Sequence, residues 1–153
     1  MLHSNSLRPA QASVEAIDSI TQQLKGLANA AKSATGTELS SLVTQYNELL
    51  TQVDNLAADT TYQGLNLVNG TGQTLKISFS TNTASVLNVS SVDLTTGSLG
   101  LNISSAASFS VVANIDAAIT ELDTALITLR GDASSLGSNV ALLETRLDFT
   151  EKY

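Results

Sequence analysis

The sequence predicts a mostly α-helical, elongated rod of three long helices, two N-terminal and one C-terminal, with a small antiparallel β region. Apolar residues recur three and four positions apart in three long stretches, which is the pattern of amphipathic helices. Between about residues 64 and 100 the pattern changes to alternation, which predicts β-hairpins. With 153 residues, 42% of them apolar, the chain is long enough to form one domain with a core.

Two N-terminal helices are expected, at about residues 10–34 and 38–58. The apolar positions of the first are Ile17, Ile20, Leu24, Leu27, Ala31 and Ala34. Those of the second are Leu39, Leu42, Tyr46, Leu49, Val53 and Leu56. Gly36 is expected to end the first helix and Thr37 to cap the second. The gap is so short that the second helix either folds back or continues with a kink, and the sequence leaves both open.

The C-terminal helix is expected at about residues 108–151 and has the longest apolar seam. Its members are Ile115, Ile119, Leu122, Leu126, Leu129, Ala133, Leu136, Val140, Leu143 and Leu147. Arg130-Gly131-Asp132 has the composition of an adhesion tripeptide, which needs an extended, protruding backbone. The tripeptide falls between the seam residues Leu129 and Ala133, so we expect it on the outer face of a continuous helix.

The β-hairpin region at residues 64–100 has four alternating stretches. Their apolar positions are Leu65/Leu67, Leu75/Ile77/Phe79, Leu87/Val89 and Val92/Leu94. The segments NGTGQ and STNTAS separate the stretches and have the composition of turns. We therefore expect short strands joined by tight connections.

Composition excludes several classes of function. The net charge of −7 and the pI near 4.4 oppose binding to nucleic acid or to anionic membrane surfaces. No apolar run approaches the roughly 20 residues of a membrane span. The chain has no Cys, and its single His, His3, lies in a polar stretch expected to be disordered. No metal site or cofactor is expected.

Catalysis is not expected either. An enzyme that uses paired carboxylates would need them to converge in one site. The candidate acids instead follow one another along the predicted C-terminal helix, as on a solvated face: Asp116, Glu121, Asp123, Glu144 and Asp148. No nucleophile elbow, phosphate-binding loop or zinc-protease motif occurs.

Three stretches, in this order, resemble domain 1 of bacterial flagellins. They are VDNLAADTTYQGLNLVNG, SSVDLTTGSLGLN and IDAAITELDTALITLRGDASSLGSNVALLETRLDFTEKY, the last of them similar to alphaproteobacterial flagellins. The resemblance covers roughly residues 12–153 and implies one rod-like domain over residues 9–153. Residues 1–8 are expected to be a tag or a disordered start. The terminal inner-core helices and the large outer insert of many flagellins are not matched.

The resemblance implies a structural subunit of the flagellar filament rather than an enzyme. Such a protein would self-assemble through its helix faces and be exported by the flagellar type III route without a cleaved signal peptide. The chain by itself is expected to be monomeric, with export chaperone and filament cap contacted only by parts it lacks. Two alternatives stay open: a hook-filament junction protein, and a non-flagellar helical adhesin or binding module.

Candidate subunit-interface residues lie off the predicted seams. They are Gln22, Gln23, Lys25, Gln45, Glu48, Gln52, Arg130 and Arg146, and the alternative for each is an ordinary solvated helix face. Flagellins detected by the innate immune receptor have an Arg and a Glu where this chain has Gln23 and Gln45, whereas Leu27 keeps the family's residue. The resemblance therefore implies weak or no binding to that receptor. Whether the Ser- and Thr-rich region at residues 78–98 is O-glycosylated is left open.

Overall fold

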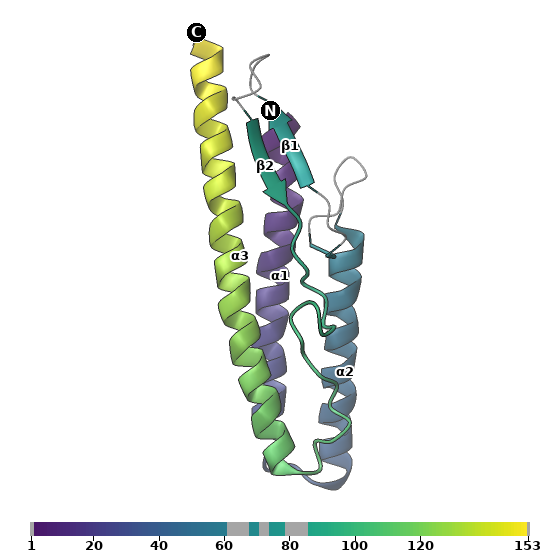
Figure 1. The fold of residues 1–153 in the computed structure, drawn as a ribbon. Coiled ribbons are helices and arrows are strands. Elements are labelled where there is room, and N and C mark those ends of the chain that lie inside the picture. The colour runs from purple at the N-terminus through teal and green to yellow at the C-terminus, as the bar shows by residue number, and fades with distance from the viewer. Residues whose placement is uncertain (1, 61–67, 71–73, 79–85, 153) are drawn as a thin grey trace.

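The computed structural model describes residues 2–60, 68–70, 74–78 and 86–152. This part of the chain forms helices α1 (Leu2–Ala31), α2 (Gly36–Asp59) and α3 (Val112–Lys152), and an antiparallel hairpin of β1 (Thr74–Ser78) and β2 (Val86–Ser90). Figure 1 shows an elongated helical bundle, with the hairpin at the end where both chain termini lie. The predicted mostly helical rod with a small antiparallel β region is confirmed.

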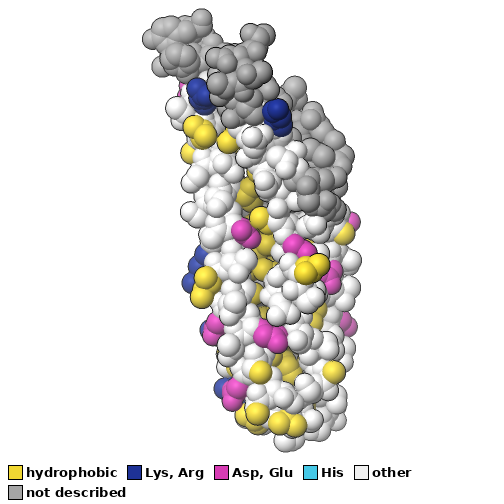
Figure 2. Space-filling model, viewed as in Figure 1, with side chains coloured by type: hydrophobic (Ala, Val, Ile, Leu, Met, Phe, Trp, Pro, Cys, Tyr) yellow, Lys and Arg dark blue, Asp and Glu magenta, His cyan; other side chains and the backbone are white. Residues whose placement is uncertain are grey.

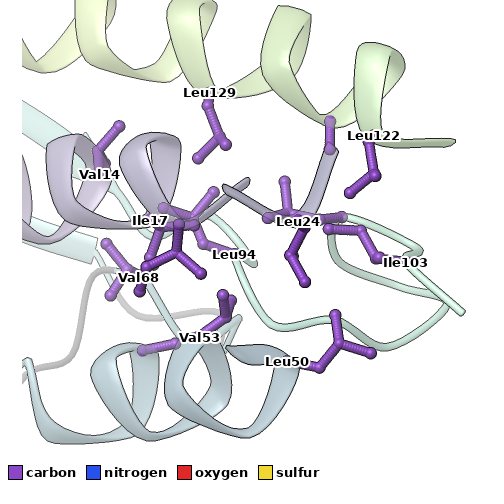
Figure 3. Close-up of a cluster of buried hydrophobic side chains, with 14 of the residues drawn as sticks. Val14, Ile17, Leu24, Leu50, Val53, Val68, Leu94, Ile103, Leu122 and Leu129 are labelled. Carbon is purple, nitrogen blue, oxygen red and sulfur yellow. The ribbon is translucent and has the colours of Figure 1, made fainter. Parts of the chain in front are cut away.

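Helix α1 is the element on which the others pack, since it contacts both α2 and α3. Its apolar seam continues N-terminally from Ile17 through Val14 and Ala10 to Leu7, again in steps of three and four, and all four side chains are buried. In Figure 3, Leu122 and Leu129 of α3 lie on one side of this seam, and Leu50 and Val53 of α2 lie on the other. A rod this narrow can bury a core only along such seams.

Helix α2 folds back along α1, which settles the alternative that the sequence left open. The expected boundaries need correction, however. Helix α1 ends at Ala31, and Gly36 is the first residue of α2 instead of the end of α1. Gly36 has a φ of 58°, a left-handed conformation that suits glycine and helps the chain reverse. The N-cap is Thr35, without a side-chain hydrogen bond, so the cap predicted at Thr37 is wrong.

The start of the chain also differs from the expectation. Residues 2–8, expected to be a tag or disordered, form the first two turns of α1. The physical reason is that α3 extends to Lys152 and runs beside them. Leu7 is fully buried, and Arg8 Nη2 lies 2.8 Å from Glu144 Oε1 of α3.

The hairpin confirms part of the predicted alternation. Leu75 pairs with Val89 and Ile77 with Leu87, and Ile77 and Val89 are buried against the core. The other expected stretches fare differently. Leu65, Leu67 and Phe79 lie outside the described residues. Val92 and Leu94 do not form a strand, because Asp93 makes only an isolated bridge with Asn69.

Residues 95–106, which we call the anchored loop, join the hairpin region to α3 without regular structure. Backbone hydrogen bonds close the loop on itself, with 2.8 Å from Leu101 N to Thr95 O and 3.0 Å from Ile103 N to Thr96 O. Two carboxylates of the helices hold it from outside. Asp54 accepts from Thr96 N at 2.8 Å, and Glu121 accepts from Ser104 N at 2.9 Å. The loop is therefore fixed to both α2 and α3.

After the anchored loop, α3 begins at Val112 instead of the expected residue 108. Phe109 is buried, and its ring packs edge-on against that of Tyr46, with 4.9 Å between centroids and an interplanar angle of 64°. Turn hydrogen bonds from Phe109 N to Ala106 O and from Val111 N to Ser108 O occupy this stretch. The aromatic pair ties the start of α3 to the middle of α2.

Two substitutions on α3 test whether the buried seam holds the bundle together. Leu122→Ala empties a fully buried position and should lower the free energy of unfolding by about 2–5 kcal/mol. Ile127→Ala, on the same helix but 69% exposed, is the control and should change it by no more than about 0.5 kcal/mol. Denaturant titration followed by circular dichroism measures both. Equal effects of the two variants would contradict this core.

Candidate subunit-interface surfaces

An open groove of about 410 Å³ lies between α1 and α2. We call it the glutamine groove. It is lined by Gln23, Gly26, Leu27, Gln45, Glu48, Leu49 and Gln52. Leu27 and Leu49 are half-buried members of the seams and form its apolar floor, whereas Gln23, Gln45 and Gln52 are exposed around them.

The groove brings together five of the nine residues singled out from the sequence: Gln23, Leu27, Gln45, Glu48 and Gln52. They come from two helices and meet only because α2 folds back on α1. Gln22 is not among them. Its amide Nε2 lies 2.6 Å from Asp18 Oδ1, one turn earlier on the exposed side of α1. Sequence analysis missed Gly26, whose small size leaves the groove open at that point.

Lys25 lies on the flank of α1 that faces α3. Its Nζ is 2.6 Å from Asp123 Oδ1, and Lys32 Nζ is likewise 2.6 Å from Asp116 Oδ1. With the pair of Arg8 and Glu144, two salt bridges within the described residues join α1 to α3, and Lys32, one residue beyond the end of α1, makes a third with α3. All six side chains are more than a third exposed, so each pair is worth about 1 kcal/mol or less. The ion pairs therefore contribute little to the free energy of unfolding.

The Arg130-Gly131-Asp132 tripeptide is helical, as expected, because it lies inside α3. Arg130 is exposed and borders a small recess with Glu15 and Asp18 of α1. Asp132 departs from the expected outer face, since it is half-buried and lines a recess between α3 and strand β2. Arg146 is exposed near the C-terminal end of α3. The structure therefore does not bring Arg130 and Arg146 into the glutamine groove.

The same rod occurs in known proteins. Flagellin FljO and flagellin FljM of Caulobacter vibrioides are 33% and 32% identical to the chain over 97% of its length. The crystal structure of Bacillus cereus flagellin matches with a TM-score of 0.81 at 25% identity, covering 95% of this chain and 84% of that one. The chain is a flagellin-type protein. It spans 56% of the length of each Caulobacter flagellin, and no protein-family model matches it.

The face of this flagellin-type rod shown in Figure 2 is mostly polar and has few charges. On the face in Figure 2, hydrophobic side chains form a narrow seam between broad uncharged polar areas, with acidic side chains scattered along them. Among the described residues, five large apolar side chains are nevertheless exposed, and sequence analysis did not single them out. They are Leu99, Val111, Val112, Ile127 and Leu142. Ile127 and Leu142 could have been noticed because they fall outside the seam of α3.

Two of the described titratable groups, Tyr46 and Asp132, have a raised pKa. Burial raises the pKa of Tyr46, and the nearby charge of Glu121 adds to the effect. The Tyr46 hydroxyl is buried and makes no hydrogen bond within the described structure, which leaves a polar group unsatisfied beside Phe109. Among the described residues, no three His, Cys, Asp or Glu side chains cluster as metal ligands would, and no helix has the length and apolarity of a membrane span.

Asp132 is one group through which pH should affect this fold. Burial under the hairpin raises its pKa above the ordinary 3.8. A carboxyl group with a raised pKa in the folded state favours folding when protonated. That contribution is fully present below the ordinary pKa and is lost as the pH rises through the folded-state value. At neutral pH the ionised Asp132 is therefore unfavourable for the recess that it lines with Asn88, Ser135 and Asn139.

We expect Asp132→Asn to raise the melting temperature at pH 7 by about 1–3 °C, since the side chain is only half-buried. The gain should shrink as the pH falls and vanish below about pH 3, where the wild-type carboxyl group is also neutral. Thermal unfolding across this pH range measures the effect. Asp148→Asn, an exposed carboxylate on the same helix, controls for the change in net charge. A gain that does not depend on pH would contradict the assignment.

Proposed function

We propose that the chain is the rod segment of a flagellar filament subunit. The observation that supports this most directly is the similarity to two flagellins over nearly the whole chain, together with the matching rod of a third. The fold is a narrow helical rod, and none of the described pockets is an enclosed cavity. Such a rod is suited to lateral contact with other copies. Its role is then structural rather than catalytic.

In this proposal the protein works outside the cell, in the filament that drives swimming, with other flagellin subunits as partners. Export would follow the flagellar type III route without a cleaved signal peptide. Contacts with an export chaperone and with the filament cap would use regions of the longer relatives that lie outside their alignment with this chain. The hook-filament junction protein is the nearest alternative. The adhesin alternative is weaker, because Arg130-Gly131-Asp132 is helical.

Assembly distinguishes these proposals. The complete gene product, polymerised at high salt from purified monomer, should form long helical filaments visible by electron microscopy. The 153-residue chain alone should remain an elongated monomer in light scattering and small-angle X-ray scattering. Deleting the gene should abolish or weaken swimming, with recovery on complementation. A complete product that stops at a small closed oligomer would contradict the filament role and favour a junction or binding protein.

The receptor prediction rests on the glutamine groove. Gln23 and Gln45 lie in one groove with Leu27, but neither bears a charge. We therefore expect the chain to activate the innate immune flagellin receptor weakly or not at all in a reporter-cell assay. The double variant Gln23→Arg and Gln45→Glu restores the charges found in detected flagellins and should increase the signal. Strong activation by the unmodified chain at nanomolar concentration would refute this prediction.

A further inference from the structure

We propose that the tip of the anchored loop, Leu99, inserts into the glutamine groove of a second copy of this chain. The inference depends on the proposed role as a self-assembling subunit and names one contact that would build the assembly. It joins two features that the flagellin likeness does not explain by itself. One is a leucine displayed to solvent, and the other is a groove with an apolar floor.

Leu99 is displayed by a loop that is otherwise fixed. Its exposed fraction is 91%, the largest among the large apolar side chains described, whereas Leu101 and Ile103 just after it are buried. The backbone turns tightly here, with 3.0 Å from Gly100 N to Gly97 O. A Cβ on Gly100 would lie 2.6 Å from Asp93 Oδ1, so the close packing at this turn depends on glycine. A fixed, exposed leucine loses little conformational entropy when it binds.

The glutamine groove has matching chemistry. Its volume of about 410 Å³ exceeds one leucine side chain, and Leu27 and Leu49 supply an apolar floor. The segment TTGSLGLN at residues 95–102 has no charged side chain, so it presents an apolar tip flanked by peptide groups. A glutamine amide can donate a hydrogen bond to a peptide C=O and accept one from a peptide N–H. The groove can therefore bind these uncharged peptide groups without an ion pair. Gln23, Gln45 and Gln52 surround the floor.

The positions of loop and groove on α2 decide how copies would join. Asn47 and Asp54 hold the loop through Ala106 N at 3.0 Å and Thr96 N at 2.8 Å. Gln45 and Gln52 line the groove and precede those two residues by two positions, which is about 160° around a helix. The loop and the groove therefore lie on opposite sides of the same stretch of α2.

A leucine on one side cannot enter the groove on the other side of its own molecule. Each copy would therefore offer Leu99 to one neighbour and its groove to another, at a similar height along the rod. This head-to-tail contact uses two different patches, so it can propagate into a ring or a filament. In a two-fold dimer, by contrast, Leu99 and the groove of one copy would both have to lie on the side that faces the other copy.

The first test is the critical concentration for polymerisation of the complete gene product. Leu99→Ala should raise it roughly tenfold, the size of effect expected when one buried leucine contact is lost. Leu99→Met keeps an apolar tip and should stay near wild type. Because Leu99 is 91% exposed, both variants should keep the melting temperature of the monomer. An unchanged critical concentration for Leu99→Ala would overturn the proposal.

The second test uses the absence of cysteine from the sequence, which makes introduced thiols unique. The double variant Leu99→Cys and Gln45→Cys, assembled and then mildly oxidised, should give a ladder of covalent oligomers on denaturing gels. A mixture of the two single variants should stop at dimers. The control pair Leu99→Cys and Thr128→Cys places the second thiol on exposed α3 and should give no ladder. Filaments of the Leu99→Cys/Gln45→Cys variant without a ladder would overturn this contact and leave the filament role standing. Failure of the wild-type protein to polymerise would contradict the filament role itself.

Discussion

The apolar seam of α1 is the constraint on which the rest of the structure depends. Its side chains are covered by α3 on one flank and by α2 on the other, as Ile17 and Leu24 show in Figure 3. A single helix contributes too little apolar surface to be stable alone, so three long helices share one narrow core. The rod shape follows because the helices are long and their shared core is only as wide as these seams.

Polar side chains of the helices hold the backbone of the anchored loop. The carboxylates of Asp54 and Glu121 and the amide of Asn47 accept hydrogen bonds from backbone N–H groups of the anchored loop. Each bond satisfies a peptide group that has no partner in a helix or strand. The loop therefore keeps a defined shape although it has no regular structure, and Val68, Leu94 and Ile103 can be buried beside the helices.

The surface divides into two kinds of boundary between helices. Between α1 and α3, three salt bridges among the described residues join Arg8 and Lys25 of α1, and Lys32 just beyond its end, to acidic residues of α3. Between α1 and α2, the glutamine groove has an apolar floor and one charged lining residue, Glu48. The first boundary is satisfied within the molecule. The second boundary presents mainly neutral amides and leucines. Such a surface is expected where an uncharged partner surface binds, and it agrees with the proposed contact between copies of this chain.

Periodicity in the sequence determined the helices. Apolar residues spaced three and four positions apart fall on one side of an α-helix, so the segment is stable as an amphipathic helix buried along that stripe. The nine described residues predicted as the seam of α3, from Ile115 to Leu143, are buried or half-buried. The three quoted stretches also pointed to the flagellin type. Tertiary structure alone decided the rest. The helical start at Leu7, the loop that presents Leu99 and the meeting of Gln23 with Gln45 depend on contacts between residues far apart in the chain, and local pattern has no information about which faces will pack together.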